Sequence, residues 1–273
     1  MKEMKINSME KLFDEIKSRS GWGFRGQASC NWPLTSGIDR TINNIRDNNR
    51  LLTGQHQNIF LEMRSISELL NLNQEQLEKF GLNIQNDDNF LLIQVLLQHY
   101  GYKTRLIDWT KNWKIALYFC LEDNSQKDDM VLWCINYKKI PPVNTAISDE
   151  NYLFPTILFE DSKMYSFFFR LKEGVYLIDE PFFHRIQKQE GFLLTTGHTE
   201  YMTFEEQVLN SPCLNKDDVI LYQISNNLRN DIKMFLHENN IDKKRLYPKD
   251  DLNIQPPQVD LQNLANSIYL KNT

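Results

Sequence analysis

The stretch from residue 89 to residue 121 constrains the fold more than any other part of the chain. Asn89 to Tyr100 is apolar almost all round, which is typical of a helix buried in the middle of a domain. Gly101 follows in the position of a C′ glycine that ends a helix, and Leu106-Ile107 then predicts a short strand. Trp113 to Leu121 predicts a second apolar helix. Two apolar helices flanking a strand indicate a domain in which helices and sheet share one core.

Other periodic segments add elements on both sides of this stretch. Met9 to Ile16 has helical spacing, with Asn7 as its expected N-cap and Glu10 reaching back to it. Trp22 to Arg25 predicts a strand that delivers Arg25 to a loop opened by Gly26. Between residues 40 and 80 the pattern predicts helices broken around Thr53-Gly54, and further strands are predicted at Met130 to Ile135, Val175 to Ile178 and Val219 to Ile224. Asn112 or Thr110 is expected to cap the helix that starts near Trp113. A last helix is predicted from Leu228 to Glu238, capped by Asn226 or Asn227 and ended by Asn239-Asn240.

These elements predict one α+β domain over residues 1–250. A helical segment from about residue 40 to residue 100 is inserted between the first strand of its core and the rest of the sheet, and a polar tail occupies residues 251–273. With 273 residues and 41% apolar content, the chain can fill a core of this size.

Charge and cysteine usage narrow the functional classes. The net charge of −5 is spread without a long single-sign block, so no basic tail indicates nucleic acid binding, although a local basic cleft is compatible with it. The four cysteines lack a CxxC pair, which favours buried free thiols over a zinc site. The N-terminal sequence has no apolar signal core, and no stretch reaches the ~20 apolar residues of a membrane span. We therefore expect a cytoplasmic protein that does not enter a membrane.

Short motifs rich in glycine, arginine and aromatic residues recur along the chain. The first is Phe24-Arg25-Gly26-Gln27, followed by Trp32-Pro33-Leu34 and Arg40. It resembles the opening signature of the FRG domain, a bacterial and phage-associated module. The resemblance extends over about residues 5 to 250 through Gln98-His99-Tyr100-Gly101, Thr104-Arg105-Leu106, Asp108-Trp109-Thr110, Asn112, Ala116-Leu117-Tyr118-Phe119, Arg185-Ile186, Gln189, Gly191-Phe192 and Leu246-Tyr247-Pro248. Trp113 stands where the family commonly has proline, which leaves the exact start of the next helix open.

Three basic residues in these motifs are candidate ligand contacts. Arg25 lies between an aromatic residue and a glycine, where its guanidinium could bind a carboxylate or phosphate in a two-pronged fashion. An internal ion pair is the alternative for Arg25, and for Arg105 a structural salt bridge with Asp108 is favoured. His99 could act as a general base, whereas a buried, hydrogen-bonded histidine is the default interpretation.

The other candidates are aromatic and polar residues close to the predicted strand ends. The rings of Tyr100 and Trp109 could stack on a base or nicotinamide, although core packing is the commoner role of such residues. Asp108 and Thr110 end a strand just before a helix, where backbone N–H groups can meet an anion or a ribose. Thr110 could equally serve as a helix cap.

A Gln-Glu pair precedes the late apolar run that begins at Phe192. Glu190 could hold a ribose hydroxyl or stabilise a cationic intermediate, and Gln189 could donate a hydrogen bond in the same place without supplying charge. A solvated turn is the simpler interpretation of both residues.

Together these positions also resemble the three-part layout of ADP-ribosyltransferases, which implies a split β core and NAD as substrate. The resemblance gives Arg25 the role of anchoring NAD, Thr110 with Asp108 the position beside nicotinamide, and Gln189 or Glu190 the position beside the scissile glycosidic bond. The matching position is Gln189, an amide where a carboxylate would serve better. The predicted catalytic set is Arg25, Thr110, Gln189 and Glu190, and the predicted NAD contacts are Arg25, Gly26, Gln27, His99, Tyr100, Arg105, Asp108 and Trp109.

Three functions remain open from the sequence. The first is an NAD-dependent transferase that modifies a macromolecular acceptor, as a toxin or anti-phage effector restrained by an inhibitory partner. The second is a non-enzymatic module that recognises a nucleotide or nucleic acid through phosphate contacts. The third is a hydrolase or nuclease built on His99, Asp108 and Glu190, for which no metal-carboxylate motif is recognisable.

Overall fold

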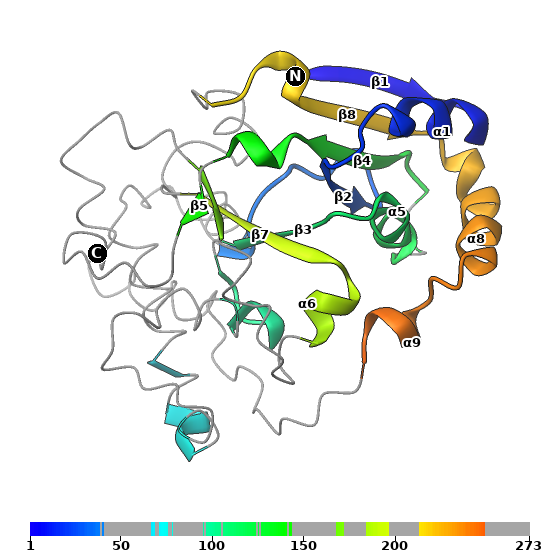
Figure 1. The fold of residues 1–273 in the computed structure, drawn as a ribbon. Helices are drawn as coiled ribbons and strands as arrows, with labels where there is room; N and C mark the ends of the chain where they lie inside the picture. Colours follow the sequence, from blue (N-terminus) through cyan, green and yellow to red (C-terminus); the bar gives the residue numbers. More distant parts are fainter. Residues whose placement is uncertain are drawn as a thin grey trace, which may run out of the picture.

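The computed structural model describes residues 1–38, 40, 67–68, 71–75, 78, 95, 97–104, 106–123, 125, 127–140, 142–143, 168–171, 184–196 and 213–248. These residues form a mixed sheet with helices packed beside it, which agrees with the predicted α+β class (Figure 1). Most of the predicted helical insertion, the predicted strand Val175 to Ile178 and the C-terminal tail lie outside the described residues. No described helix is long and apolar enough to cross a membrane.

The sheet has eight strands in the order β1-β8-β4-β2-β3-β7-β6-β5. The outer pairs β1/β8 and β5/β6 are parallel, and every other neighbouring pair is antiparallel. The strand bounds are β1 Lys2–Ile6, β2 Gly23–Gln27, β3 Leu106–Thr110, β4 Met130–Ile135, β5 Pro142–Val143, β6 Phe168–Leu171, β7 Gly191–Thr196 and β8 Val219–Ile224.

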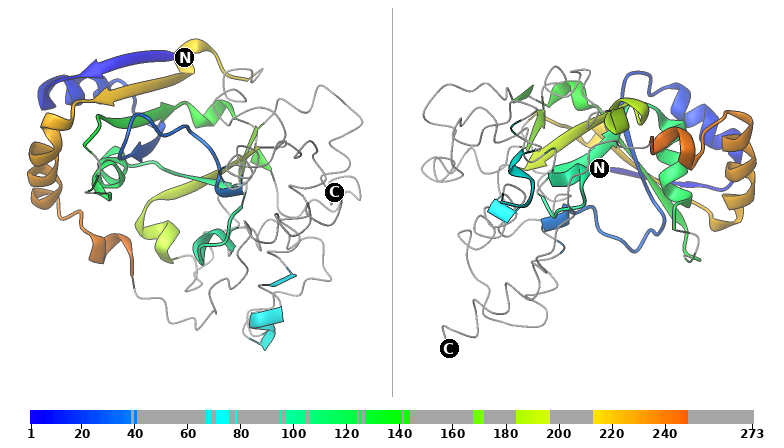
Figure 2. Two further views of the ribbon diagram at one scale, coloured as in Figure 1. Left: turned by 180° about the vertical axis from the view of Figure 1, so that it is seen from behind. Right: turned by 90° about the horizontal axis from the view of Figure 1, so that it is seen from below.

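Short helices complete the described structure. Their bounds are α1 Met9–Lys17, α5 Trp113–Leu121, α6 His184–Lys188, α8 Arg229–Glu238 and α9 Lys243–Leu246, with 3-10 turns η2 Tyr137–Lys139, η7 Lys216–Asp218 and η8 Asn226–Leu228. Helices α1, α5 and α8 gather on one side of the molecule in both views of Figure 2.

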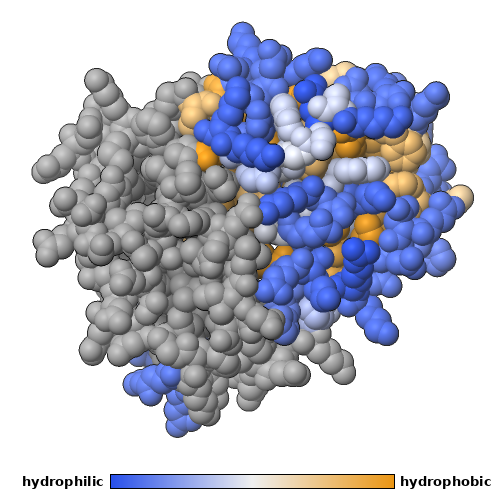
Figure 3. All heavy atoms as spheres, in the orientation of Figure 1, coloured by the Kyte–Doolittle hydropathy of each residue, from blue (hydrophilic) through white to orange (hydrophobic). Residues whose placement is uncertain are grey.

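The central strand β4 is buried on both faces, so its side chains divide the core into two halves. Met130, Leu132 and Cys134 pack with α1, α5 and α8, whereas Val131 and Trp133 pack with residues of β3 and β7 on the opposite face. This alternation follows from the two-residue period of a strand. Outside the core, hydrophilic side chains cover most of the described surface in the view of Figure 3.

The predicted central stretch is confirmed where it is described. Gly101 has a φ of +86°, and the amide of Tyr102 donates to the carbonyl of Leu97, which is the geometry of a glycine-terminated helix. Helix α5 begins at Trp113, and its cap is Asn112, whose side chain accepts from the Lys114 amide at 3.0 Å. Thr110 is therefore not the cap.

Other predicted helix caps were wrong by short distances. Helix α1 begins at Met9 as predicted, but Ser8, not Asn7, caps it, because Ser8 directly precedes the first helical residue and its hydroxyl accepts from the Lys11 amide at 3.2 Å. Helix α8 has no side-chain cap from Asn226 or Asn227, because these residues form the turn η8 in front of it. Asn239 and Asn240 do end α8 as predicted.

Gly26 lies inside β2 and does not open a loop after it. A Cβ atom at this position would stand 1.9 Å from the Ala116 carbonyl oxygen and 2.8 Å from the Cys120 amide nitrogen. The absent side chain thus lets β2 pack directly against α5, and the strand continues to Gln27.

Candidate functional site

A pocket of about 720 Å³ opens where β2 and β3 separate. The ladder between these strands holds a single pair, Phe24 with Thr110, whereas β2 pairs with β4 along its whole length. Residues of β2 and β3 line the pocket together with the end of α5, helix α6 and Tyr247. The charged and aromatic residues in this lining are Phe24, Arg25, Trp32, Arg40, Asp108, Trp109, Phe119, Glu122, Asp123, Arg185 and Tyr247.

Arg25 reaches across the separation between the strands. Its Nη1 donates to the backbone carbonyl of Asp108 at 2.7 Å, and its buried Nε has no hydrogen-bond partner among the described residues. Burial lowers the pKa of Arg25, the Asp108 carboxylate opposes this shift, and the neighbouring Arg40 adds to it. No described carboxylate forms an ion pair with Arg25, so the guanidinium is available to an anion in the pocket.

Asp108 is held by a short hydrogen-bond chain. Gln98 Nε2 donates to Asp108 Oδ2 at 2.8 Å, and the Thr104 hydroxyl donates to Gln98 Oε1 at 2.6 Å. Thr104 is fully buried, whereas Asp108 is exposed on the pocket wall. Gln98 therefore serves the site indirectly, by fixing the orientation of the Asp108 carboxylate.

Gln27 shapes the pocket by holding the backbone of the segment that follows β2. The Gln27 side chain is buried, accepts from the Trp133 indole and donates to the carbonyls of Trp32 at 3.4 Å and Pro33 at 3.3 Å. These bonds hold the chain that carries Trp32, a residue that is 42% exposed and lines the pocket.

Thr110 and the Gln-Glu pair are joined, but they face different surroundings. The buried Thr110 hydroxyl donates to the backbone carbonyl of Gln189 at 2.7 Å. Gln189 lines the pocket, and its Nε2 donates to the Leu246 carbonyl at 3.2 Å. Glu190 has a positive φ of 47°. Its carboxylate accepts from the side-chain amide of Asn112 at 2.8 Å and is not part of the pocket lining. The pair thus brings an amide, and no carboxylate, to the pocket wall.

The remaining predicted contacts are not brought to the pocket as ligand-facing side chains. The Trp109 ring is buried and stacks on Phe192 at 6.4 Å between centroids, so the residue lines the pocket from within the core. His99 and Tyr100 pack edge to face at 4.8 Å and are not among the described lining residues. Arg105 lies outside the described residues.

Several further residues contribute charge or ring surface that the sequence reasoning did not assign to the site, among them Arg40, Glu122, Arg185 and Tyr247. The Arg185 guanidinium lies 4.6 Å above the Tyr247 ring, and the Tyr247 hydroxyl donates to Glu122 Oε1. Burial, reinforced by Glu122, raises the pKa of Tyr247, so its phenol stays a donor at neutral pH. Arg40 donates to the Thr35 carbonyl at 2.8 Å. Arg40, Arg185 and Tyr247 all lie in the recognised motifs, which was the available signal, whereas nothing marked Glu122.

The pocket lining therefore carries both positive and negative charges. Its described lining carries three arginines, Arg25, Arg40 and Arg185, and three carboxylates, on Asp108, Glu122 and Asp123. Such a lining suits a ligand with both anionic groups and neutral hydroxyl or amide groups. Among the described residues, no group of three or more His, Cys, Asp or Glu side chains could hold a metal ion.

Comparison with known proteins gives one finding that bears on this site. The model of the FRG domain family matches residues 20–129, which include β2, β3, α5 and Arg25, Asp108 and Glu122 of the pocket. Neither curated proteins nor solved structures gave a match. The match supports assignment of this part of the chain to the FRG domain family.

Proposed function

We propose that the pocket between β2 and β3 binds NAD and that the protein is an ADP-ribosyltransferase-like enzyme acting on a macromolecule. The observation that carries the proposal is the position of Arg25 beside Arg40 in a pocket where Asp108 and Gln189 also meet. Two neighbouring guanidinium groups repel each other, and a pyrophosphate between them removes that repulsion. A volume of about 720 Å³ falls within the usual range for cofactor sites.

The arginines and the exposed ring divide the recognition of NAD between them. Arg25 and Arg40 bind the pyrophosphate, because a guanidinium matches phosphate oxygens in a two-pronged geometry. Trp32 offers an accessible aromatic face to the adenine or the nicotinamide. The amide of Gln189 adds hydrogen bonding without charge.

Asp108 or Glu122 supplies the carboxylate that Gln189 lacks. Loss of nicotinamide breaks the bond between ribose C1′ and the pyridinium nitrogen, and the electron pair leaves with neutral nicotinamide. A carboxylate beside C1′ stabilises the resulting oxocarbenium-like charge. The acceptor nucleophile then bonds to C1′ and gives its proton to the carboxylate. Glu190, bound to Asn112 outside the lining, is not given this role.

Calorimetric titration with NAD tests the binding step. We expect wild-type protein to bind NAD and Arg25→Gln to lose at least tenfold in affinity, because a charged hydrogen bond contributes about 1.5–3 kcal/mol. Arg245→Gln is the matched control, since Arg245 is exposed on α9 and is not among the residues lining the pocket. Equal NAD affinity in Arg25→Gln, with a folded thermal profile, would refute the assignment.

A non-enzymatic nucleotide-recognition module is the second candidate. The contacts of Gln189 and Glu190 favour it, because they leave the position expected beside the glycosidic bond with an amide and without a carboxylate that faces the pocket. This candidate predicts NAD or nucleotide binding that depends on Arg25 and falls with salt, but no release of nicotinamide. The roles of toxin and anti-phage effector rest on the FRG resemblance and belong with the transferase proposal.

A further inference from the structure

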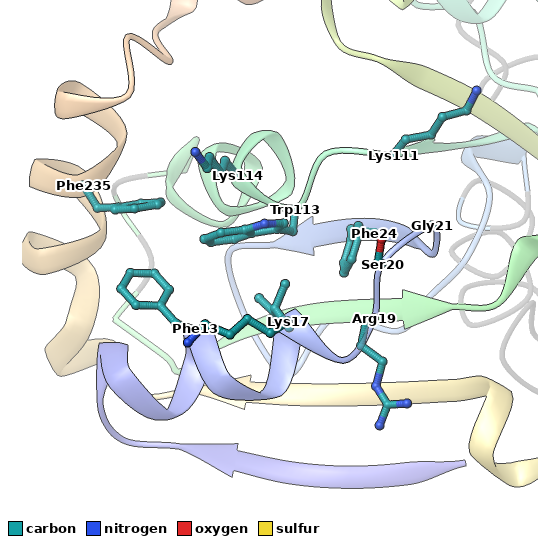
Figure 4. Close-up of a pocket in the computed structure, with 11 residues that line it drawn as sticks. Phe13, Lys17, Arg19, Ser20, Gly21, Phe24, Lys111, Trp113, Lys114 and Phe235 are labelled. Carbon is teal, nitrogen blue, oxygen red and sulfur yellow. The ribbon is translucent and has the colours of Figure 1, made fainter.

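A second pocket, of about 550 Å³, lies between α1, α5 and α8 (Figure 4). Phe24 lines both pockets, and Lys111, which lines the second, directly follows Thr110 of the first. The two pockets are therefore neighbours across β2 and the segment that leads into α5.

One wall of this pocket is an aromatic cluster drawn from three helices. The Trp113 ring is stacked on Phe235, with centroids 5.4 Å apart and planes inclined by 16°. Phe13 closes the cluster at 5.8 Å from Trp113 and 5.2 Å from Phe235. Figure 4 shows the Phe24 ring on the other side of Trp113, but Phe24 is buried, so the accessible rings at the hollow are the half-buried Phe13, Trp113 and Phe235.

The rim of the pocket is cationic. Its described lining holds Lys17, Arg19, Lys111 and Lys114 and no Asp or Glu. Lys114 Nζ lies 5.9 Å from the Trp113 centroid and donates to Asn239 Oδ1 at 2.6 Å, which fixes its charge above the rings. Lys17 pairs with Asp14 at 3.2 Å, but both side chains are strongly exposed, so the pair is weak and readily exchanged. Arg19 and Lys111 both extend away from the rings in Figure 4, so Lys17 and Lys114 are the cations beside them.

We propose that this pocket binds single-stranded nucleic acid. A base stacks against the half-buried Trp113 ring, and the flanking phosphates contact Lys17 and Lys114. Aromatic faces combined with a cationic rim are the two features that such binding uses, and they work for any base because every base has a flat face. An acidic peptide would satisfy the lysines but would leave the rings without a planar partner. The binding does not depend on the proposed use of NAD.

Fluorescence anisotropy with a labelled twelve-nucleotide thymidine strand tests the proposal, using the full-length protein. We expect binding at 50 mM salt that weakens steeply as salt rises, because released counterions dominate the affinity. Lys17→Gln with Lys114→Gln should lower the slope of log affinity against log salt by about 1.4, the value for two lost phosphate contacts on a single strand. Lys216→Gln removes one positive charge from the exposed turn η7, away from the pocket lining, and should leave the slope unchanged.

Two competitors separate the contributions of base and charge. An abasic strand with the same number of phosphates should bind about fivefold or more weakly, since stacking contributes about 1–3 kcal/mol per base. Binding of both strands with equal affinity would overturn the role of the rings. Binding that is unaffected by Lys17→Gln alone, an exposed change that leaves the core intact, would overturn the site. Displacement by polyglutamate as effective as by the thymidine strand would assign the pocket to an acidic peptide instead.

Discussion

Replacing Gly26 with alanine tests how closely β2 approaches α5. The new methyl carbon would stand 1.9 Å from the Ala116 carbonyl oxygen and 2.8 Å from both the amide and the sulfur of Cys120. The nearest obstacle is helix backbone, which cannot turn aside as a flexible side chain can. The strand, or the helix, must therefore shift by more than an ångström.

The expected cost follows from two opposing terms. Overpacking of this kind costs about 1–3 kcal/mol and can exceed that range when backbone must move. Alanine also reduces the freedom of the unfolded chain, which stabilises the protein by about 0.4–1 kcal/mol. We expect Gly26→Ala to lower the free energy of unfolding by about 2 kcal/mol or more, and to lower the Tm by about 4–8 °C.

Urea and thermal unfolding measure this change, with Gly37→Ala as the control. At Gly37 the added carbon would meet the Lys103 Cα at 3.5 Å, an ordinary contact, so the entropic gain should stand alone. Because Arg25 precedes Gly26 in the same strand, the shift should also weaken NAD binding. If Gly26→Ala unfolds at the wild-type temperature, β2 does not pack on α5 as described.

Three further predictions concern stability and reactivity. Gly101→Ala should cost about 1 kcal/mol in urea unfolding, because its φ of +86° is strained for alanine although no atom lies within 4 Å; an unchanged midpoint would contradict this. Burial alone would raise the pKa of Asp218, but hydrogen bonds led by Lys139 lower it overall. The ionised Asp218 carboxylate therefore stabilises the fold at neutral pH, and this stabilisation is lost as the pH falls through the lowered pKa. Asp218→Asn should flatten the dependence of urea stability on pH below pH 5, and an unaltered dependence would contradict the role of Asp218. Burial raises the pKa of Cys120 to about 12 and that of Cys134 as well, so a thiol reagent at pH 8 should reach these two only after denaturation; rapid labelling of the native protein at either position would disprove their burial.

The sequence predicted best those elements whose signal is local. The bounds of α5, β4 and β8 follow directly from apolar runs and caps, and Gly101 ends its helix as the glycine pattern indicates. Where two neighbouring residues could both serve, as with Asn7 and Ser8, the pattern could not decide, because helix boundaries depend on where the first turn packs.

The site depended on contacts between residues far apart in the chain, and here the sequence was less informative. Arg25 was predicted as a ligand contact from its glycine and aromatic neighbours, and it lines the pocket. Glu190 could not be distinguished from Gln189 by sequence, since only the turn with its positive φ directs Glu190 toward Asn112. Glu122 carried no signal at all, because its place in the pocket arises from the Tyr247 contact, which spans 125 positions of the chain.

Nicotinamide release from NAD by the purified protein is the direct test of the proposed transferase activity. Wild type, Arg25→Ala, Asp108→Asn and Glu122→Gln are compared with and without bacterial lysate as a source of acceptor. We expect release that requires lysate, is abolished by Arg25→Ala and falls at least about a hundredfold in one of the two carboxylate variants. Folded wild-type protein that binds NAD but releases no nicotinamide under either condition would contradict transferase activity and leave the nucleotide-recognition module in its place.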